Sequence, residues 1–284
     1  MIVTGGQGYI ASLVNKYSQD YEIKLLSRKD LDLSDTKKVR EYFENEEFDV
    51  VLHAGAMAQT QDCEDMPELT YKVNVLSTKA IADVCKEKDK RIVVISTEQV
   101  FNGRESGAPF VETDETVSLS AYGNHKIECE KYLQEIDVDY IIVRFSWMFG
   151  LAFPGVNPSP NILQQVLDSL FLHKEAQYTV NELRGFTYAH KFANNFDKIS
   201  VLPSGIYHVS SENDENTFKV ANKISEILAY DKEFTEQYVK QNLDKYQDKP
   251  RDFRMDAAKI KEHGIDFGSV EENLRECLTD FGWL

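Results

Sequence analysis

The sequence lacks the features that mark membrane-spanning, secreted and metal-binding proteins. No apolar run in its 284 residues approaches the ~18 residues that a transmembrane helix needs, so no such helix is expected. No basic segment followed by an apolar stretch begins the chain, so no signal peptide is expected. The cysteines are few and isolated, which predicts reduced thiols in the cytoplasm and no metal site. They are Cys63, Cys85, Cys129 and Cys277.

Positive charge is also scarce. The chain has 32 Lys and Arg residues against 48 Asp and Glu residues, which gives a formal net charge of -16. Such an acidic surface repels nucleic acid and anionic membranes, so neither is expected as a partner. A small anionic cofactor is not excluded, because a helix N-terminus and a few local cations can hold its phosphates.

Short β-branched runs alternate with amphipathic stretches through the first half of the chain. This alternation predicts an α/β fold with a Rossmann-type, doubly wound parallel sheet. Strands are expected at 1–4, 22–26, 49–53, 91–96 and 140–144, and helices at 9–17, 35–43, 68–86 and 120–134.

The pattern changes after Gly150. A proline-containing loop is expected at 151–160, helices at 162–171, 189–199, 217–230, 255–263 and 270–281, and strands at 177–180 and 205–209. We therefore expect a dinucleotide-binding Rossmann domain at 1–150. A smaller, mainly substrate-binding C-terminal lobe is expected at 151–284, with a chain that can cross back to the sheet.

The first predicted turn carries a glycine pattern that suits a dinucleotide. Residues 4–11 read Thr-Gly-Gly-Gln-Gly-Tyr-Ile-Ala between the first strand and the first helix. Gly5 permits a tight turn, Gly8 lets the backbone approach a pyrophosphate, and Ala11 lets the helix pack closely on the strand. The alternative is a plain glycine turn. Cofactor contacts are expected from Gly5, Gln7, Gly8, Tyr9 and Ile10.

The end of the second predicted strand bears on the choice of dinucleotide. Ser27-Arg28-Lys29 stands where NAD-preferring folds often place a carboxylate. A hydroxyl and two cations favour a 2′-phosphate, and hence NADPH, with NADH as the alternative if this segment is only a solvated basic turn. The adenine side is expected to be flanked by Asp32, Leu33 and the segment His53-Ala54-Gly55-Ala56.

Tyr122 and Lys126 are the candidate catalytic pair, and both are also expected to contact the cofactor, with Lys126 holding the nicotinamide ribose. They lie four residues apart on a predicted helix, which puts both side chains on one face. A tyrosine has a reference pKa of about 10, and a neighbouring ammonium is expected to lower it. The motif is not specific by itself, but it follows a strand that ends at Ser96 and Thr97, whose hydroxyls can bind a substrate carbonyl.

Two histidines are weaker candidates. His125 lies within the same predicted helix, but it is expected to face away from the Tyr122–Lys126 side and to be solvated. His53 is interpreted more simply as a packing residue at a strand end than as a base.

Several longer segments resemble the extended short-chain dehydrogenase/reductases, and among them the dTDP-4-dehydrorhamnose reductase family. Residues 95–103 (ISTEQVFNG) are similar to its ISTDYVFDG, 144–150 (RFSWMFG) to RTSWVYG, and 205–209 (GIYHV) to GIYHL. Residues 62–74 are similar to its CExxPxxAxxVN stretch, 181–189 to NDQxGxPTYA, and 249–256 to RPxxSxLD. The resemblance covers nearly the whole chain.

This resemblance implies reduction of the 4-keto group of a nucleotide-linked 4-keto-6-deoxyhexose. The nicotinamide would supply hydride and the tyrosine a proton, with Thr97, Tyr122 and Lys126 as the catalytic set. Substrate contacts are expected from Ser96, Thr97, Gln99, Trp147 and Arg251.

The chain departs from the family pattern at several positions. Gln99, Phe186 and Lys249 replace a tyrosine, a proline and an arginine, and residues 53–56 (HAGA) replace an Asn-Ala-Ala cluster. These departures leave the identity of the sugar nucleotide open.

Two other functions stay open at this point. A nucleotide-sugar epimerase, or a combined epimerase and reductase, needs an extra acid–base pair, for which Cys129 with His173 or His190 is available. A regulatory subunit would bind dinucleotide without catalysis, and the presence of Thr97, Tyr122 and Lys126 argues against it. The protein is expected to be a monomer or a homodimer.

Overall fold

The computed structural model describes all 284 residues, which form two compact units. Unit 1 contains residues 1–104, 112–144 and 193–207, and unit 2 contains residues 105–111, 145–192 and 208–284. The chain therefore leaves unit 1 and returns to it twice. The assignment of one unit to the dinucleotide and the other to the substrate stays a prediction.

Unit 1 is built on a six-stranded sheet in the order β10-β5-β4-β3-β1-β2. Its strands are β1 (Ile2–Thr4), β2 (Lys24–Leu26), β3 (Val50–His53), β4 (Arg91–Thr97), β5 (Tyr140–Phe145) and β10 (Gly205–Val209). β1 pairs in parallel with both β2 and β3, and β3 pairs in parallel with β4. Because the chain runs outward in opposite directions from β1, the carboxyl ends of β1 and β3 meet at a topological switch point. The predicted Rossmann-type fold is confirmed.

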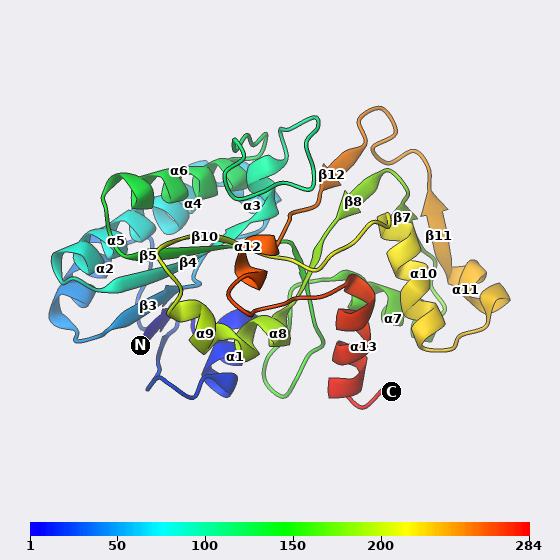
Figure 1. The fold of residues 1–284 in the computed structure, drawn as a ribbon, viewed down its shortest axis with the longest axis horizontal. Helices are drawn as coiled ribbons and strands as arrows, with labels where there is room; N and C mark the ends of the chain where they lie inside the picture. Colours follow the sequence, from blue (N-terminus) through cyan, green and yellow to red (C-terminus); the bar gives the residue numbers. More distant parts are fainter. The chain divides into compact units, whose positions relative to one another are not determined.

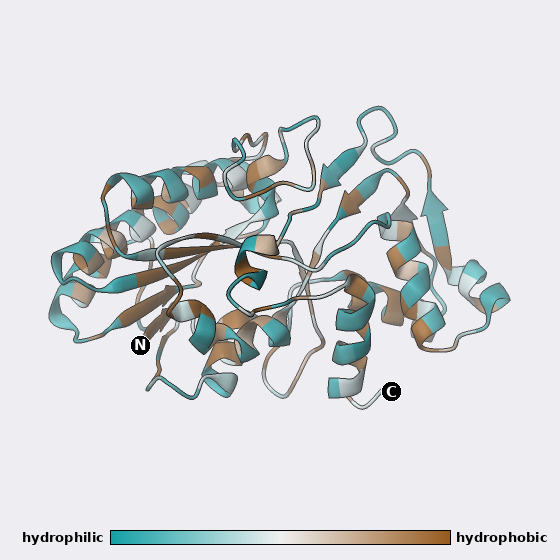
Figure 2. Ribbon diagram, in the orientation of Figure 1, coloured by the Kyte–Doolittle hydropathy of each residue, from teal (hydrophilic) through white to brown (hydrophobic).

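Helices cover both faces of this sheet (Figure 1). One face carries α2 (Thr36–Asn45), α3 (Thr60–Asp65), α4 (Pro67–Tyr71), α5 (Ser77–Glu87) and α6 (Ala121–Glu135), and the other carries α1 (Tyr9–Tyr17) and α9 (Phe196–Ser200). The Ser18 hydroxyl donates to Asp197 at 2.6 Å, which ties the end of α1 to α9. The strands are apolar through the middle of the sheet, while the helices alternate polar and apolar faces (Figure 2).

The long helix predicted at 68–86 is present, but its middle turn is π-helical rather than α-helical. A π-helical turn, η1 (Lys72–Leu76), interrupts it between α4 and α5, and α3 before it was not predicted. The wider turn brings Asn74 into the interior, where its side chain donates to the carbonyl of Met57 and accepts from the same residue's N–H. The sequence pattern of this segment does not distinguish a π-helical turn from an α-helical one.

Unit 2 combines helices with three two-stranded sheets. The helices are α7 (Ile162–Leu172), α8 (Ala189–Asn194, which ends in unit 1), α10 (Thr217–Ile227), α11 (Lys232–Tyr238), α12 (Ala258–Lys261) and α13 (Val270–Asp280). The parallel strand pairs are β6 (Trp147–Phe149) with β9 (Phe186–Tyr188), β7 (Ala176–Thr179) with β11 (Val239–Asn242), and β8 (Glu182–Arg184) with β12 (Arg251–Phe253). The single helix predicted at 189–199 is broken at Asn195 into α8 and α9.

No helix is both long enough and apolar enough to cross a membrane. No group of three or more His, Cys, Asp or Glu side chains is arranged to hold a metal ion.

Candidate functional site

The glycine turn brings the carboxyl ends of β1 and β3 close together. Gly5 has a φ of +69°, a left-handed conformation that favours glycine. A Cβ atom at Gly5 would lie 2.8 Å from the Cα atom of Gly55, so a side chain here would displace backbone. The N–H of Gly8 donates to the carbonyl of Gly5 at 2.7 Å, which closes the turn.

The N-terminus of α1 is open to an anion. Gly8 caps the helix without a side-chain hydrogen bond, and the first turn holds no acidic residue. Gln7 and Gly8 are exposed, whereas the side chains of Tyr9 and Ile10 are buried. Backbone N–H groups at this end can therefore hold a phosphate, while Tyr9 and Ile10 anchor the helix.

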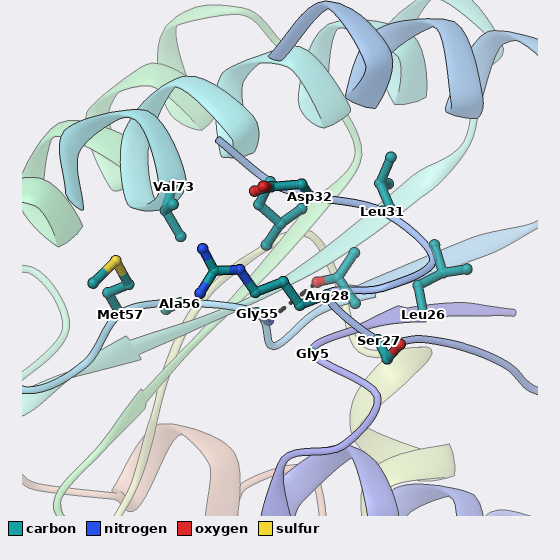
Figure 3. Close-up of a pocket in the computed structure, with 12 residues that line it drawn as sticks. Gly5, Leu26, Ser27, Arg28, Leu31, Asp32, Gly55, Ala56, Met57 and Val73 are labelled. Carbon is teal, nitrogen blue, oxygen red and sulfur yellow. Dashed lines mark hydrogen bonds between the residues drawn. The ribbon is translucent and has the colours of Figure 1, made fainter. Parts of the chain in front are cut away.

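A cavity of about 220 Å³ lies beside this turn at the switch point (Figure 3). It brings together six of the predicted cofactor residues, namely Gly5, Ser27, Arg28, Asp32, Leu33 and Gly55. Sequence reasoning missed the apolar part of its wall, which comes from Leu26, Leu31, Met57 and Val73. Leu26 and Met57 border the ends of predicted strands and could have been found. Val73 could not, because the π-helical turn η1 places it there.

Arg28 is the cation of this cavity. Its side chain is exposed and makes no ion pair, and it extends across the cavity on the side of Ala56 and Val73 (Figure 3). Asp32 lines the same cavity, and hydrogen bonds from Ser34 hold the pKa of its carboxyl below the usual value.

A carboxylate, Asp30, follows Ser27 by three residues but does not line the cavity. Asp30 accepts hydrogen bonds from both the hydroxyl and the N–H of Ser27, at 2.6 and 2.8 Å. These bonds lower the pKa of Asp30. The Ser27 hydroxyl is therefore already engaged, which leaves the guanidinium of Arg28 as the candidate contact for the predicted 2′-phosphate.

His53 supports the turn from within the protein. Its ring Nδ1 lies 2.8 Å from the hydroxyl oxygen of Thr4, which also accepts the N–H of Gly55 at 3.1 Å. Burial, with a smaller contribution from the Lys126 charge, lowers the pKa of His53 to about 3. His53 is thus a neutral packing residue, and it does not line the cavity. Ala54 beside it is half-buried.

Helix α6 carries Tyr122 and Lys126 on one buried face. The hydroxyl of Ser120 caps the helix by accepting the N–H of Gly123 at 3.1 Å. A Cβ atom at Gly123 would lie 2.6 Å from the carbonyl oxygen of Gln99, so glycine allows α6 to pack tightly on the 3₁₀ turn η2 (Glu98–Phe101). This contact holds the start of α6 against the segment that follows Thr97.

The structure corrects the expected direction of the Tyr122 pKa. The Lys126 Nζ lies 5.7 Å from the centroid of the Tyr122 ring and donates to the carbonyl of Ile95 at 2.8 Å. Burial dominates, so the pKa of Tyr122 is raised rather than lowered, and the pKa of Lys126 is lowered. A protonated phenol at neutral pH suits a proton donor.

The two hydroxyls at the end of β4 have different environments. Thr97 is half-buried, and its oxygen accepts the N–H of Gln99 at 3.2 Å. Ser96 is buried and donates to Glu130, which also forms an ion pair with Arg144. Ser96 and Thr97 point to opposite faces of the sheet, because neighbouring residues on a strand alternate. Ser96 therefore belongs to this buried network and does not make the predicted substrate contact.

His125 is buried, so the prediction that it is solvated was wrong. Its Nδ1 lies 3.4 Å from the side-chain nitrogen of Asn74, and its ring packs edge-on against Tyr71. The residues that bury His125 belong to α4 and η1, which cover this face of α6.

The cysteine proposed for an epimerase is poorly suited to acid–base chemistry. Cys129 is buried, and its thiol donates to the carbonyl of Asn74 at 3.2 Å. Burial raises the pKa of this thiol. In unit 2, His173 stacks on Tyr238 and His190 stacks on Tyr188, each within an aromatic cluster.

Trp147 and Arg251, the predicted substrate contacts in unit 2, are both accessible. Trp147 is half-buried and stacks on Phe186, with ring centroids 5.9 Å apart. Arg251 lies on β12, and its guanidinium stacks on the ring of Tyr246. Gln99, predicted as a contact in unit 1, is half-buried and accepts a hydrogen bond from Asn102 at 3.0 Å.

Comparisons with known proteins agree with this architecture. Residues 1–282 match the model of a family described as RmlD substrate binding domain. The probable low-salt glycan biosynthesis reductase Agl14 of Haloferax volcanii is 25% identical over 253 residues, which are 88% of this chain and 84% of that protein. The dTDP-4-dehydrorhamnose reductase of Salmonella typhimurium is 31% identical over 182 residues, or 63% and 59% of the two chains.

A solved structure resembles the whole fold. The dTDP-4-dehydrorhamnose reductase of Bacillus anthracis, in complex with NADP, superposes with a TM-score of 0.85 at 20% sequence identity, over 98% of this chain and 97% of that chain. The family match and the superposition confirm the resemblance noted in the sequence. The chain belongs to the RmlD substrate binding domain family.

Proposed function

We propose that the protein is an NADPH-dependent reductase of a nucleotide-linked 4-keto-6-deoxyhexose, with NADH as the alternative cofactor. The observation that supports this proposal is the packing of α6 on the end of β4, where Lys126 donates to the carbonyl of Ile95 and Gly123 lies against the carbonyl of Gln99, on either side of Thr97 in the sequence. Relatives named as reductases of dTDP-4-dehydrorhamnose supply the substrate class.

The residues of unit 1 fit a phosphorylated dinucleotide. Side chains at Gly5 or Gly55 would fill the space beside the turn, the α1 N-terminus is free of acidic side chains, and Arg28 carries an unpaired positive charge. When bound, the reduced nicotinamide supplies hydride to the substrate ketone. The cavity at the switch point would hold the adenine and its ribose.

The catalytic residues have distinct roles in this proposal. Tyr122 donates its phenolic proton to the oxygen of the ketone as negative charge develops there. The hydroxyl of Thr97 orients that oxygen by a hydrogen bond. Lys126 places an ammonium under the Tyr122 ring, which stabilises the phenolate left after proton transfer.

The remaining parts of the proposal concern the sugar contact, the cellular location and the oligomeric state of the protein. In unit 2, the face of Trp147 suits the apolar side of a 6-deoxyhexose. We further propose a cytoplasmic protein that acts as a monomer or a homodimer. The burial of Cys129 favours a simple reductase over an epimerase.

A substrate panel tests this function. The wild-type protein is mixed with NADPH and 4-keto-6-deoxyhexoses linked to dTDP, UDP or GDP, and loss of the reduced-nicotinamide absorbance is followed. We expect turnover of at least one substrate. Tight NADPH binding without turnover of any member would instead support the regulatory-subunit alternative.

A further inference from the structure

A strip of alternating cations and aromatic rings runs along the β8–β12 pair of unit 2. The guanidinium carbon of Arg184 lies 5.0 Å from the ring centroid of Trp147 and 5.4 Å from that of Phe253. The guanidinium carbon of Arg251 lies 5.8 Å from Phe253 and 3.6 Å from Tyr246. The strip therefore connects the predicted sugar contact, Trp147, with Arg251.

The register of two short strands produces this strip. β12 lies beside β8 (Figure 1) and pairs with it in parallel. In this register Arg251 lies opposite Glu182, and Phe253 lies opposite Arg184. Arg251 and Phe253 are two residues apart on β12 and therefore share a face, while Arg184 lies opposite Phe253 on β8. The buried ring of Phe253 thus lies between the two arginines.

The two arginines differ in their charge balance. Arg184 donates to Glu182 at 2.7 Å, so its charge is compensated. Arg251 has a side chain that is 42% exposed, and its only neighbouring carboxylate oxygen is the same Glu182 atom, at 4.0 Å. Arg251 therefore presents N–H donors that no carboxylate occupies, and a guanidinium fork matches the geometry of phosphate oxygens.

Tyr246 is held in place by its loop. It has a φ of +63°, a conformation that residues other than glycine seldom adopt. The side chains of Thr179 and Asn181 both donate to the carbonyl of Lys245, at 2.8 and 3.1 Å, which fixes the loop just before Tyr246. The ring therefore offers a fixed surface to Arg251 and restricts the rotamers of its side chain.

We infer that Arg251 binds the diphosphate of the nucleotide-sugar substrate and that Tyr246 is its positioning residue. The inference rests on the proposed function. Lys249, which stands where the resembled family has an arginine, lies instead 3.5 Å from Glu105 and outside the strip. Sugar and diphosphate are joined in a nucleotide sugar, and Trp147 and Arg251 lie on one strip with Arg184 and Phe253 between them.

Binding measurements on the full-length protein separate the diphosphate from the rest of the ligand. Calorimetry uses whichever of dTDP, UDP and GDP the wild type binds, together with the matching nucleoside. Arg251→Gln should weaken diphosphate binding by about ten- to a hundredfold and leave nucleoside binding unchanged. Tyr246→Gly should weaken it by about two- to fivefold, whereas Tyr246→Phe retains the ring and should bind like the wild type.

The controls keep folding apart from recognition. Glycine accepts the φ of Tyr246 without strain, so Tyr246→Gly is expected to fold, and Lys249→Gln should have a smaller effect than Arg251→Gln. Unchanged diphosphate affinity in Arg251→Gln, or equal losses for diphosphate and nucleoside, would overturn this inference but leave the proposed function standing. If the wild type binds NADPH but none of the three diphosphates, the proposed function fails with it.

Discussion

Tyr122 shows that a residue's role depends on its surroundings as much as on its motif. The four-residue spacing with Lys126 indicated an ammonium that lowers the phenol pKa. In the structure, that ammonium faces the ring and bonds to the carbonyl of Ile95, while burial raises the phenol pKa. The group is therefore suited to give a proton rather than to take one.

Removing the Tyr122 hydroxyl tests this role. Tyr122→Phe deletes one oxygen and little volume, so the fold and dinucleotide affinity should survive. Turnover should fall by roughly a hundred- to ten-thousandfold, the range for a lost general acid. Tyr132→Phe is the matched control, because Tyr132 lies on the same helix and its hydroxyl donates to Asp83. Near wild-type turnover in Tyr122→Phe would refute the mechanism.

Arg28 should determine the preference between the two dinucleotides. Arg28→Ala removes the unpaired cation of the cavity, so kcat/KM for NADPH should fall by about tenfold or more, while kcat/KM for NADH stays the same. Lys29→Ala is the control, because Lys29 does not line the cavity. Equal losses with both dinucleotides would show that Arg28 does not contact the 2′-phosphate.

At the scale of elements, α6 is tied to the sheet by a buried polar network. Glu130, one turn after Lys126, accepts from Ser96 on β4 and pairs with Arg144 on β5, with both ionic side chains 3% exposed or less. The network sets the position of α6 along β4, and so the position of Tyr122 relative to Thr97.

Breaking this pair should be costly. Glu130→Gln removes the buried carboxylate that pairs with Arg144, so the free energy of unfolding should fall by about 3–5 kcal/mol, measured by chemical denaturation. Glu44→Gln, which breaks an exposed pair with Arg40, should cost less than about 1 kcal/mol. Similar losses of unfolding free energy in the two variants would show that the buried pair stabilises the fold no more than an exposed pair does.

Elements with clear periodicity were predictable, and those defined by tertiary contacts were not. The helix at 9–17 and the strand at 205–209 have the predicted bounds, because hydrophobic pattern and turn residues agree there. β6, β8, β9 and β12 have three residues each, too few for an alternating pattern. The cavity residues at strand ends followed from topology, whereas Val73 and the burial of His125 depend on the π-helical turn.

At the scale of the whole molecule, His53 links proton binding to folding. Its pKa is about 3 in the folded protein against about 6.5 when unfolded, so the unfolded chain binds more protons between these values. The stabilisation is fully present above pH 6.5 and is lost as the pH falls towards 3. The free energy of unfolding should drop by up to about 5 kcal/mol over that window, more steeply than in His53→Gln. Parallel pH profiles for the two proteins would contradict this coupling.

The path of the chain between the two units limits how the protein can be divided. Residues 193–207 return to unit 1 and supply α9 and most of β10, the edge strand beside β5. A fragment ending at Gly150 would leave β5 as an open apolar edge, a template for pairing with another chain. Genetic fusion or truncation at that point is therefore expected to yield an aggregating fragment, and an exchange of unit 2 with a relative would have to replace three separate stretches while preserving the two segments of unit 1 between them.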